Sequence, residues 1–166
     1  MTGDASEAPD NPGVIAPPPL IYASALAVGL VTRGMVGRGV SRHAPAYPVF
    51  FLSRVLGWLL IVVGVGIGAL GFREMRRAGT NVDPREPTTA IVTEGPYHFT
   101  RNPLYLGMTL IYSGIAVRAN AFPAVLLLPA VLFVMQRGVI EREERYLERK
   151  FGDEYLRYKT RVRRWL

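Results

Sequence analysis

The sequence predicts an all-α integral membrane protein with about four transmembrane helices, a C-terminal helical hairpin and a cytosolic helical cap. Two observations predict this fold class. Apolar residues make up 49% of the 166 residues, and the mean hydropathy of the chain is positive. In addition, four long segments carry almost no charge, and polar clusters stand at their ends.

The clearest membrane segment is 55–72, which contains no charged residue between Arg54 and Arg73. At about 1.5 Å per residue it would extend roughly 27 Å, close to the hydrocarbon thickness of a bilayer. The first segment is expected to begin near Leu20, because the three prolines before it cannot lie inside a regular helix. Residues 1–19 are then a flexible tail, and 20–166 form a single domain. The predicted spans lie near 20–36, 50–72, 103–117 and 119–138.

The third and fourth segments are separated by Arg118 alone, so they are expected to form an antiparallel hairpin. Strong helix formers in 139–150 let the second arm continue beyond the membrane. Gly152 can end this helix and Asp153 can begin another, which together predict a C-terminal cap over 139–166.

Glycines recur along one face of the second segment and again in the third, which predicts that another helix can approach each of them closely. They are Gly57, Gly64, Gly68 and Gly71 in the second segment and Gly107 and Gly114 in the third. Such glycine faces can serve contacts within one chain or between two chains, so the oligomeric state stays open.

Basic residues gather on one side of the predicted topology. Four spans place both termini and the connection 73–102 on the same side, which then holds 15 of the 20 basic residues. By the positive-inside tendency, both termini and the site between them are cytoplasmic in a multi-pass protein of the cell membrane.

The formal net charge of +7 is compatible with nucleic-acid binding, but the arginines flank apolar helices and are interleaved with acidic residues. That arrangement favours anionic lipid as the partner and argues against nucleic acid. The absence of cysteine excludes disulfides and thiolate metal sites. With only His43 and His98, a histidine-built metal site is not expected either.

The third segment opens with Arg101-Asn102-Pro103. Asn102 suits the N-cap and Pro103 the first helical position, so free amides and a partial positive charge would stand at the membrane boundary. A carboxylate or phosphate can dock there with help from Arg101. Alternatively, Arg101 only snorkels, Asn102 only caps, and Tyr105 belongs to the interfacial aromatic belt.

Three glutamates, Glu141, Glu143 and Glu144, follow the fourth segment, and the hairpin returns them to the level of Arg101. Carboxylates accept hydrogen bonds from ammonium groups and from ribose hydroxyls. Glu141 is spaced to form an ordinary solvated pair with Arg145. At least one of the other two glutamates should face the third segment.

These motifs combine into a longer pattern over roughly the last 90 residues. It consists of Gly95-Pro96-Tyr97, Arg101-Asn102-Pro103-Leu104-Tyr105-Leu106-Gly107, Glu143-Glu144, Leu147, Phe151-Gly152, Tyr155, Tyr158 and Arg163-Arg164-Trp165. The pattern resembles the isoprenylcysteine carboxyl methyltransferase and phospholipid methyltransferase superfamily. The resemblance implies an integral membrane enzyme that binds S-adenosylmethionine at the cytosolic face. Its acceptor would be lipophilic and would enter from the bilayer: an isoprenylcysteine-like carboxylate, a phospholipid amine or another small hydrophobic nucleophile.

Carried over residue by residue, the resemblance implies catalytic roles for Arg101, Asn102 and Glu144. The residues that it implies for cofactor binding are Gly95, Tyr97, His98, Arg101, Asn102, Pro103, Tyr105, Leu106, Glu143, Glu144 and Tyr158. The chain departs from the pattern at Asn102, where isoprenylcysteine methyltransferases generally have histidine. Asparagine can replace a neutral imidazole in a hydrogen bond but cannot shuttle a proton near neutral pH. If the reaction needs a base there, His98 or a glutamate must supply it.

Two other functions remain open at this point. Membrane sterol and enoyl reductases have C-terminal regions that look similar, so an NADPH-dependent membrane reductase is one alternative. A non-catalytic lipid-binding or assembly protein is the other, with Arg101 and the glutamates forming only an ion-pair network. The connection 73–102 is predicted to be irregular, as either a moving lid or a static surface loop.

Overall fold

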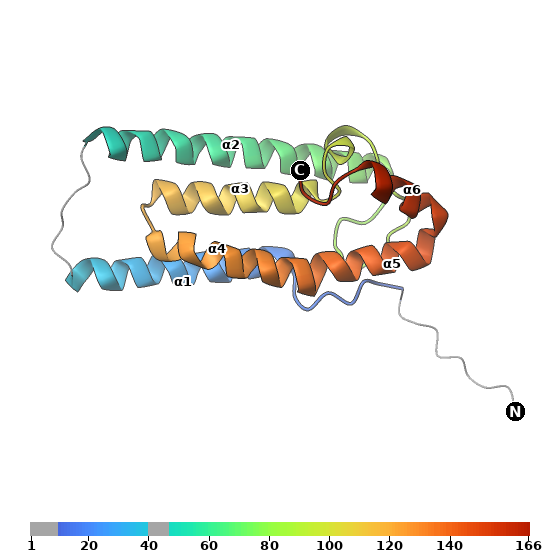
Figure 1. Ribbon diagram of the computed structural model, residues 1–166, viewed down its shortest axis with the longest axis horizontal. Coiled ribbons are helices and arrows are strands. Elements are labelled where there is room, and N and C mark those ends of the chain that lie inside the picture. Colours follow the sequence, from blue (N-terminus) through green and yellow to red (C-terminus); the bar gives the residue numbers. More distant parts are fainter. Residues whose placement is uncertain (1–9, 40–46) are drawn as a thin grey trace, which may run out of the picture.

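The computed structural model describes residues 10–39 and 47–166, and within these ranges it contains helices and no strand (Figure 1). The helices are α1 (Pro18–Gly39), α2 (Tyr47–Arg77), α3 (Pro103–Arg118), α4 (Phe122–Met135), α5 (Glu141–Phe151) and α6 (Asp153–Arg161). A 3₁₀ turn at Gly95–His98 precedes α3, and a π-helical turn at Gln136–Ile140 joins α4 to α5. The predicted all-α class is confirmed.

The helices form a bundle with a polar cap at one end. Helix α3 packs mainly along α2, and α4 lies along α1. Helix α5 continues the line of α4 beyond the apolar length, and α6 turns back from its end (Figure 1). The 78–102 connection and α6 therefore meet α5 in the cap.

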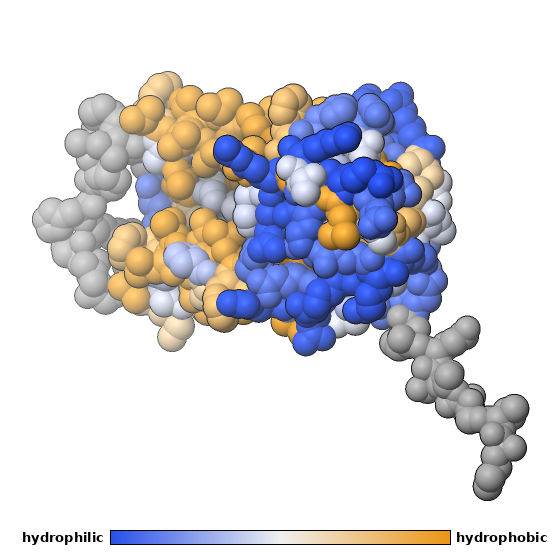
Figure 2. Space-filling model, turned by 45° about the vertical axis from the view of Figure 1, so that its right-hand side comes forward, coloured by the Kyte–Doolittle hydropathy of each residue, from blue (hydrophilic) through white to orange (hydrophobic). Residues whose placement is uncertain are grey.

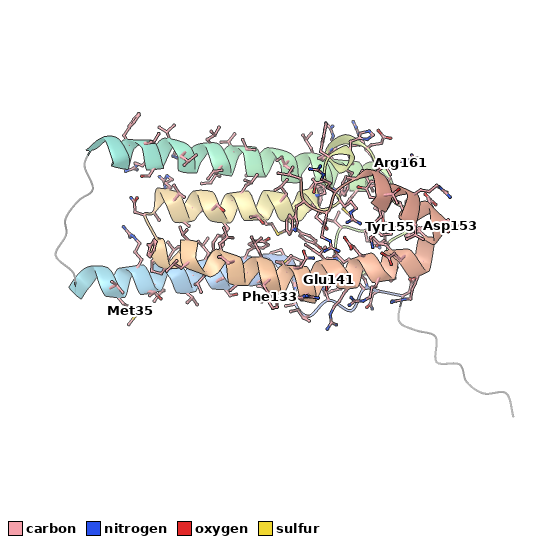
Figure 3. The ribbon with its side chains drawn as sticks, viewed as in Figure 1. Met35, Phe133, Glu141, Asp153, Tyr155 and Arg161 are labelled. Atoms are coloured by element: carbon pink, nitrogen blue, oxygen red, sulfur yellow. The ribbon has the colours of Figure 1, made fainter. Side chains whose placement is uncertain are left out.

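Three helical stretches are long and apolar enough to cross a membrane: Pro18–Val36, Phe51–Arg77 and Phe122–Phe151. Figure 2 shows apolar residues covering one end of the molecule and hydrophilic residues covering the cap. In Figure 3, Met35 and Phe133 project outward from the apolar length, where both are exposed. The chain is thus an all-helical membrane protein. Helix α3, with 16 residues, is shorter than these stretches, and a fourth crossing at 103–117 stays a prediction.

The glycine faces let another helix approach closely, as predicted, and the structure shows that α2 and α3 approach each other through two reciprocal glycine contacts. A Cβ placed on Gly64 would lie 2.7 Å from the carbonyl oxygen of Gly107, and a Cβ on Gly107 would lie 2.7 Å from that of Gly64. Seven residues along each helix, Gly57 and Gly114 meet in the same way. The two backbones touch because neither helix carries a side chain at the crossing.

Several helix ends differ from the predicted ones. Helix α1 begins at Pro18 instead of Leu20, because proline is tolerated in the first turn, where its missing N–H has no intrahelical partner. Helix α2 continues past residue 72 to Arg77, since the next residue suited to ending it is Gly79, with φ +68°. Helix α4 starts only at Phe122, after Asn120 with φ +49°.

The predicted tail 1–19 also needs correction. Residues 1–9 lie outside the described residues, as do 40–46 in the connection between the first two spans. The segment 10–17, in contrast, lies against the cap, where Arg142 donates a 2.8 Å hydrogen bond to the carbonyl oxygen of Gly13. The local composition of this segment gives no sign of these contacts, because their partners lie far away in sequence. The sequence therefore predicted a tail.

Candidate functional site

A cavity of about 120 Å³ lies in the cap, where α2, the 78–102 connection, α3, α5 and α6 meet. Most of the residues predicted for the site line its wall. They are Tyr97, Arg101, Asn102, Pro103, Tyr105, Glu143, Glu144 and Tyr158. The hairpin of α3 and α4 and the extension of α4 into α5 bring these residues together from three parts of the chain.

Three predicted residues, Gly95, His98 and Leu106, do not line this cavity. Gly95 has φ +60° and packs against the side chain of Glu74, whose Cγ would lie 3.0 Å from a Cβ there. His98 is exposed, lies 3.5 Å from a carboxylate oxygen of Glu94, and borders a separate surface hollow. Gly95 therefore shapes the loop that carries Tyr97.

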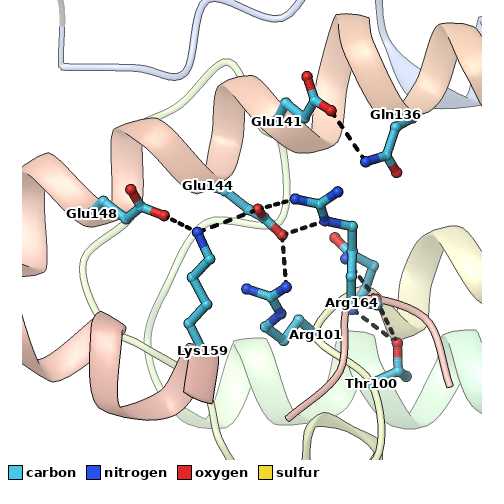
Figure 4. A network of polar contacts seen from close by, with 9 residues as sticks. Thr100, Arg101, Gln136, Glu141, Glu144, Glu148, Lys159 and Arg164 are labelled. Carbon is cyan, nitrogen blue, oxygen red and sulfur yellow. Dashed lines mark hydrogen bonds and ion pairs between the residues drawn. The ribbon is translucent and has the colours of Figure 1, made fainter. Parts of the chain in front are cut away.

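Glu144 is buried at the centre of a cationic cluster (Figure 4). Its carboxylate accepts hydrogen bonds from Arg164, with Nε at 2.9 Å and Nη2 at 2.6 Å. Arg101 Nη2 lies 3.2 Å away and Lys159 Nζ lies 4.0 Å away. The protein itself therefore compensates the charge of Glu144. Arg164 in turn keeps a raised pKa because of its hydrogen bond to Glu144.

Asn102 does not cap α3 with its side chain, contrary to the prediction. Its Nδ2 donates a 2.9 Å hydrogen bond to the carbonyl oxygen of Arg164, which also accepts one from Thr100 Oγ1 at 3.1 Å. The amide of Arg101 donates to the carbonyl oxygen of Arg163 at 3.0 Å. Asn102 therefore ties the C-terminal segment to the start of α3, while Pro103 occupies the first turn as predicted.

Arg164 is the site residue that the sequence analysis missed. Its guanidinium donates hydrogen bonds to Glu144, and its carbonyl oxygen accepts one from Asn102. The only available signal was its place in the family-like pattern, since no local rule pairs it with a glutamate 20 residues earlier.

Arg101 has unused hydrogen-bonding capacity. Only 9% of its side chain is exposed, and one of its nitrogens, Nη2, faces Glu144. Its Nε and Nη1 are buried and have no hydrogen-bond partner among the residues that the structure describes. Arg101 lines the cavity, and because a buried guanidinium donor normally finds an acceptor, these two donors can bind an acceptor group that reaches them.

Glu143 lies on the same wall and accepts a hydrogen bond from the hydroxyl of Tyr105 on α3. Within the described ranges, Glu143 forms no ion pair, unlike its neighbour Glu144. The prediction that at least one of the two glutamates faces the third segment is therefore confirmed. Glu143 therefore offers the cavity a carboxyl group that has no ion-pair partner among the described residues.

Tyrosines close the cavity on the side of α6. Tyr158 donates a 2.8 Å hydrogen bond to the carbonyl oxygen of Tyr97, and the rings of Tyr155 and Tyr158 lie 6.2 Å apart. Burial raises the pKa of all three phenols, so they remain neutral at physiological pH. In Figure 3, Tyr155 on α6 lies between that helix and α5.

The glutamates do not form a metal centre with their neighbours. No group of three or more histidine, aspartate or glutamate side chains within residues 10–39 and 47–166 is arranged to hold a metal ion. The polar groups of the cavity instead offer hydrogen-bond donors and acceptors of both charges on a partly apolar wall.

Comparisons with known proteins find two relatives and one family. An uncharacterized protein of Haemophilus influenzae is 43% identical over 63 residues, which are 38% of this chain and 79% of that protein. A protein-S-isoprenylcysteine O-methyltransferase of Schizosaccharomyces pombe is 35% identical over 72 residues, which are 43% of this chain but only 30% of that enzyme. No solved structure matches. The family model for phospholipid methyltransferases matches residues 52–154, which run from α2 through the whole of α5. The chain therefore belongs to the phospholipid methyltransferase family.

Proposed function

We propose that the chain transfers a methyl group from S-adenosylmethionine to a lipophilic acceptor at the polar face of a membrane. The observation that carries this proposal is that one cavity is lined by both Arg101, which has two buried donors without a partner, and Glu143, which has no ion pair among the described residues. Membership of the family and the position of the cavity at the end of an apolar bundle support it.

The groups on the wall fit the polar parts of S-adenosylmethionine. Arg101 would bind the methionyl carboxylate, and Glu143 would bind its ammonium or the ribose hydroxyls. Tyr97, Tyr105 and Tyr158 would contact the adenosine, since neutral phenols combine an apolar face with a hydrogen-bonding hydroxyl. Bound there, S-adenosylmethionine would supply an electrophilic methyl group on its sulfonium.

Asn102 and Glu144 act in this proposal as positioning residues. The Asn102 amide holds the backbone of Arg164, and Glu144 is surrounded by cations that hold it in place. Both therefore fix Arg101 instead of contacting the reacting atoms. Where an acceptor must lose a proton, Glu143 is the carboxylate on the cavity wall that can take it, without histidine at position 102.

The acceptor would reach the cavity from the bilayer. Met75, Pro103 and Leu104 give part of the cavity an apolar lining at the junction of α2 and α3. Such a wall suits the lipophilic part of an acceptor, and exclusion of water together with in-line positioning would account for most of the rate enhancement. The bias of basic residues toward the cap supports a cytoplasmic site in the cell membrane and contact with anionic lipid.

The test is titration of S-adenosylmethionine by calorimetry on the full chain in lipid nanodiscs, with NADPH as the parallel ligand. Arg101→Lys and Glu143→Gln should each weaken S-adenosylmethionine binding by about 10- to 100-fold, since a hydrogen bond to a charged group contributes about 1.5–3 kcal/mol. Glu141→Gln is the matched control, because Glu141 pairs with Arg137 and does not line the cavity.

Saturable binding should be followed by transfer of a radiolabelled methyl group into a lipid extract. Binding of NADPH instead would indicate the reductase. Binding of neither ligand by the wild type would favour a non-catalytic role.

A further inference from the structure

The segment 10–16 runs along the outside of the cap and is tied to α5. The carboxylate of Asp10 accepts hydrogen bonds from the hydroxyl of Tyr146 at 2.9 Å and from Lys150 Nζ at 2.6 Å. Further along, Arg142 Nη1 donates to the carbonyl oxygen of Gly13 at 2.8 Å. We call residues 10–16 the strap.

The strap is also anchored at the π-helical turn between α4 and α5. The amide of Ile15 donates a 3.2 Å hydrogen bond to the carbonyl oxygen of Gly138, inside this turn. The side chain of Ile15 occupies the space where any side chain at residue 138 would stand. A π turn interrupts the regular helical hydrogen-bond ladder. Here the carbonyl oxygen of Gly138, inside that turn, accepts its hydrogen bond from the strap.

Tyr146 connects the strap to the 78–102 connection. Its side chain is buried, and its hydroxyl accepts a 3.1 Å hydrogen bond from the amide of Thr88 while it donates to Asp10. Pro12 of the strap, Thr88 and Tyr146 all line the cavity. One hydroxyl therefore joins three chain segments that form the outer wall of the candidate site.

The family match does not include the strap. It begins at residue 52, whereas the strap precedes α1. The Asp10 contact also differs from the contacts deeper in the cap. Asp10 has 59% of its side chain exposed and Lys150 has 27%, whereas Glu144 has 7%. Exposed ion pairs are weak and are screened by salt, so this contact can open while the buried cluster stays intact.

From these contacts we infer that the strap is a closing wall of the proposed S-adenosylmethionine site, and that Asp10 is a positioning residue that controls how fast the ligand exchanges. The inference rests on the proposed function. The hydrogen bond from Lys150 lowers the pKa of Asp10, so its carboxylate stays ionised at neutral pH and holds the contact closed. Opening would release Pro12 from the wall and remove the carboxylate that accepts the hydrogen bond of the Tyr146 hydroxyl.

The experiment measures dissociation of S-adenosylmethionine from the full chain in nanodiscs, for the wild type, Asp10→Asn and Tyr146→Phe. Asp10→Asn should raise the dissociation rate by about 2- to 5-fold, as expected for loss of an exposed charged contact. Tyr146→Phe should raise it by at least as much, because it removes the hydroxyl that joins the strap to Thr88. Asp10→Glu should restore the wild-type rate. Asp153→Asn is the matched control, because Asp153 is exposed at the start of α6 and does not line the cavity.

Hydrogen–deuterium exchange without ligand gives an independent measurement. Asp10→Asn should increase exchange in residues 80–92 as well as in the strap, because Tyr146 joins the two. The wild type could bind S-adenosylmethionine while both variants keep the dissociation rate and the hydrogen exchange of the wild type. That result would overturn the strap inference and leave the proposed function standing. If the wild type does not bind S-adenosylmethionine, the proposed function fails, and so does the inference that the strap controls the dissociation of this ligand.

Discussion

Replacing Gly64 by alanine tests whether the close crossing of α2 and α3 holds the site together. In the structure a Cβ at residue 64 would lie 2.7 Å from the carbonyl oxygen of Gly107 and 3.0 Å from side-chain atoms of α3. Ordinary contacts of this kind begin near 3.4 Å, so the two backbones would have to move apart by several tenths of an ångström. The contact partner at 2.7 Å is a backbone atom and cannot move aside as a flexible side chain can.

The expected magnitude comes from comparison with Gly66→Ala in the same helix, where nothing lies within 4 Å of the added Cβ. Both changes gain the same helix propensity, about 1 kcal/mol, so this contribution cancels. Overpacking costs about 1–3 kcal/mol and should affect Gly64→Ala alone. We therefore expect Gly64→Ala to be less stable than Gly66→Ala by about 1–3 kcal/mol.

The assay is reversible unfolding in mixed detergent micelles with increasing SDS, followed by far-UV circular dichroism. Equal free energies of unfolding for the two variants would refute the crossing. A consequence for the site can be measured in parallel. Gly71 packs on Pro103, 3.2 Å from a Cβ at residue 71, so separation of the helices should also displace the start of α3 and weaken S-adenosylmethionine binding.

Three further predictions concern the cap. Glu144→Gln should lower the free energy of unfolding by about 3–5 kcal/mol in the same assay, because it leaves the buried guanidinium of Arg101 without its anion; a loss below about 1 kcal/mol would contradict the cluster. Gly152→Ala should cost about 1–3 kcal/mol, since φ +52° with ψ −127° is a region open to glycine, and unchanged stability would show that the α5–α6 corner relaxes. His98→Ala should leave the calorimetric affinity for S-adenosylmethionine within about twofold of wild type, because His98 lies outside the cavity; a larger change would place it in the site.

Local signals in the sequence predicted the parts of the fold that depend on neighbouring residues. Uncharged runs predicted the helices, Pro103 predicted the start of α3, and Gly152 predicted the end of α5. The glycine face of α2 was predictable for the same reason, since helical spacing alone places those residues together. Helix ends were less predictable, as α4 shows at Phe122.

Contacts between distant residues could not be predicted in this way. Asn102 looked like an N-cap because its type and position fit one, but its amide instead binds Arg164, 62 residues later. The strap looked like a tail because its partner Tyr146 is 136 residues away from Asp10. In both cases local sequence rules suggest one role for a polar side chain, whereas in the fold the side chain binds a residue far away in sequence. Only the folded structure shows which of the two occurs.

The two adjacent glutamates of α5 lie in different environments, one in the buried ion cluster and one at the proposed ligand site. Glu144 faces the cations of the cap, and its charge is compensated before any ligand binds. Glu143, the preceding residue, faces Tyr105 of α3 and has no ion pair among the described residues. Because successive residues on a helix point about 100° apart, one turn of α5 presents a carboxylate to each environment. The same backbone that fixes the buried cluster therefore positions the Glu143 carboxyl group on the cavity wall. Arg101 completes the arrangement, since Glu144 binds one of its nitrogens and thereby holds the two unpartnered donors in place.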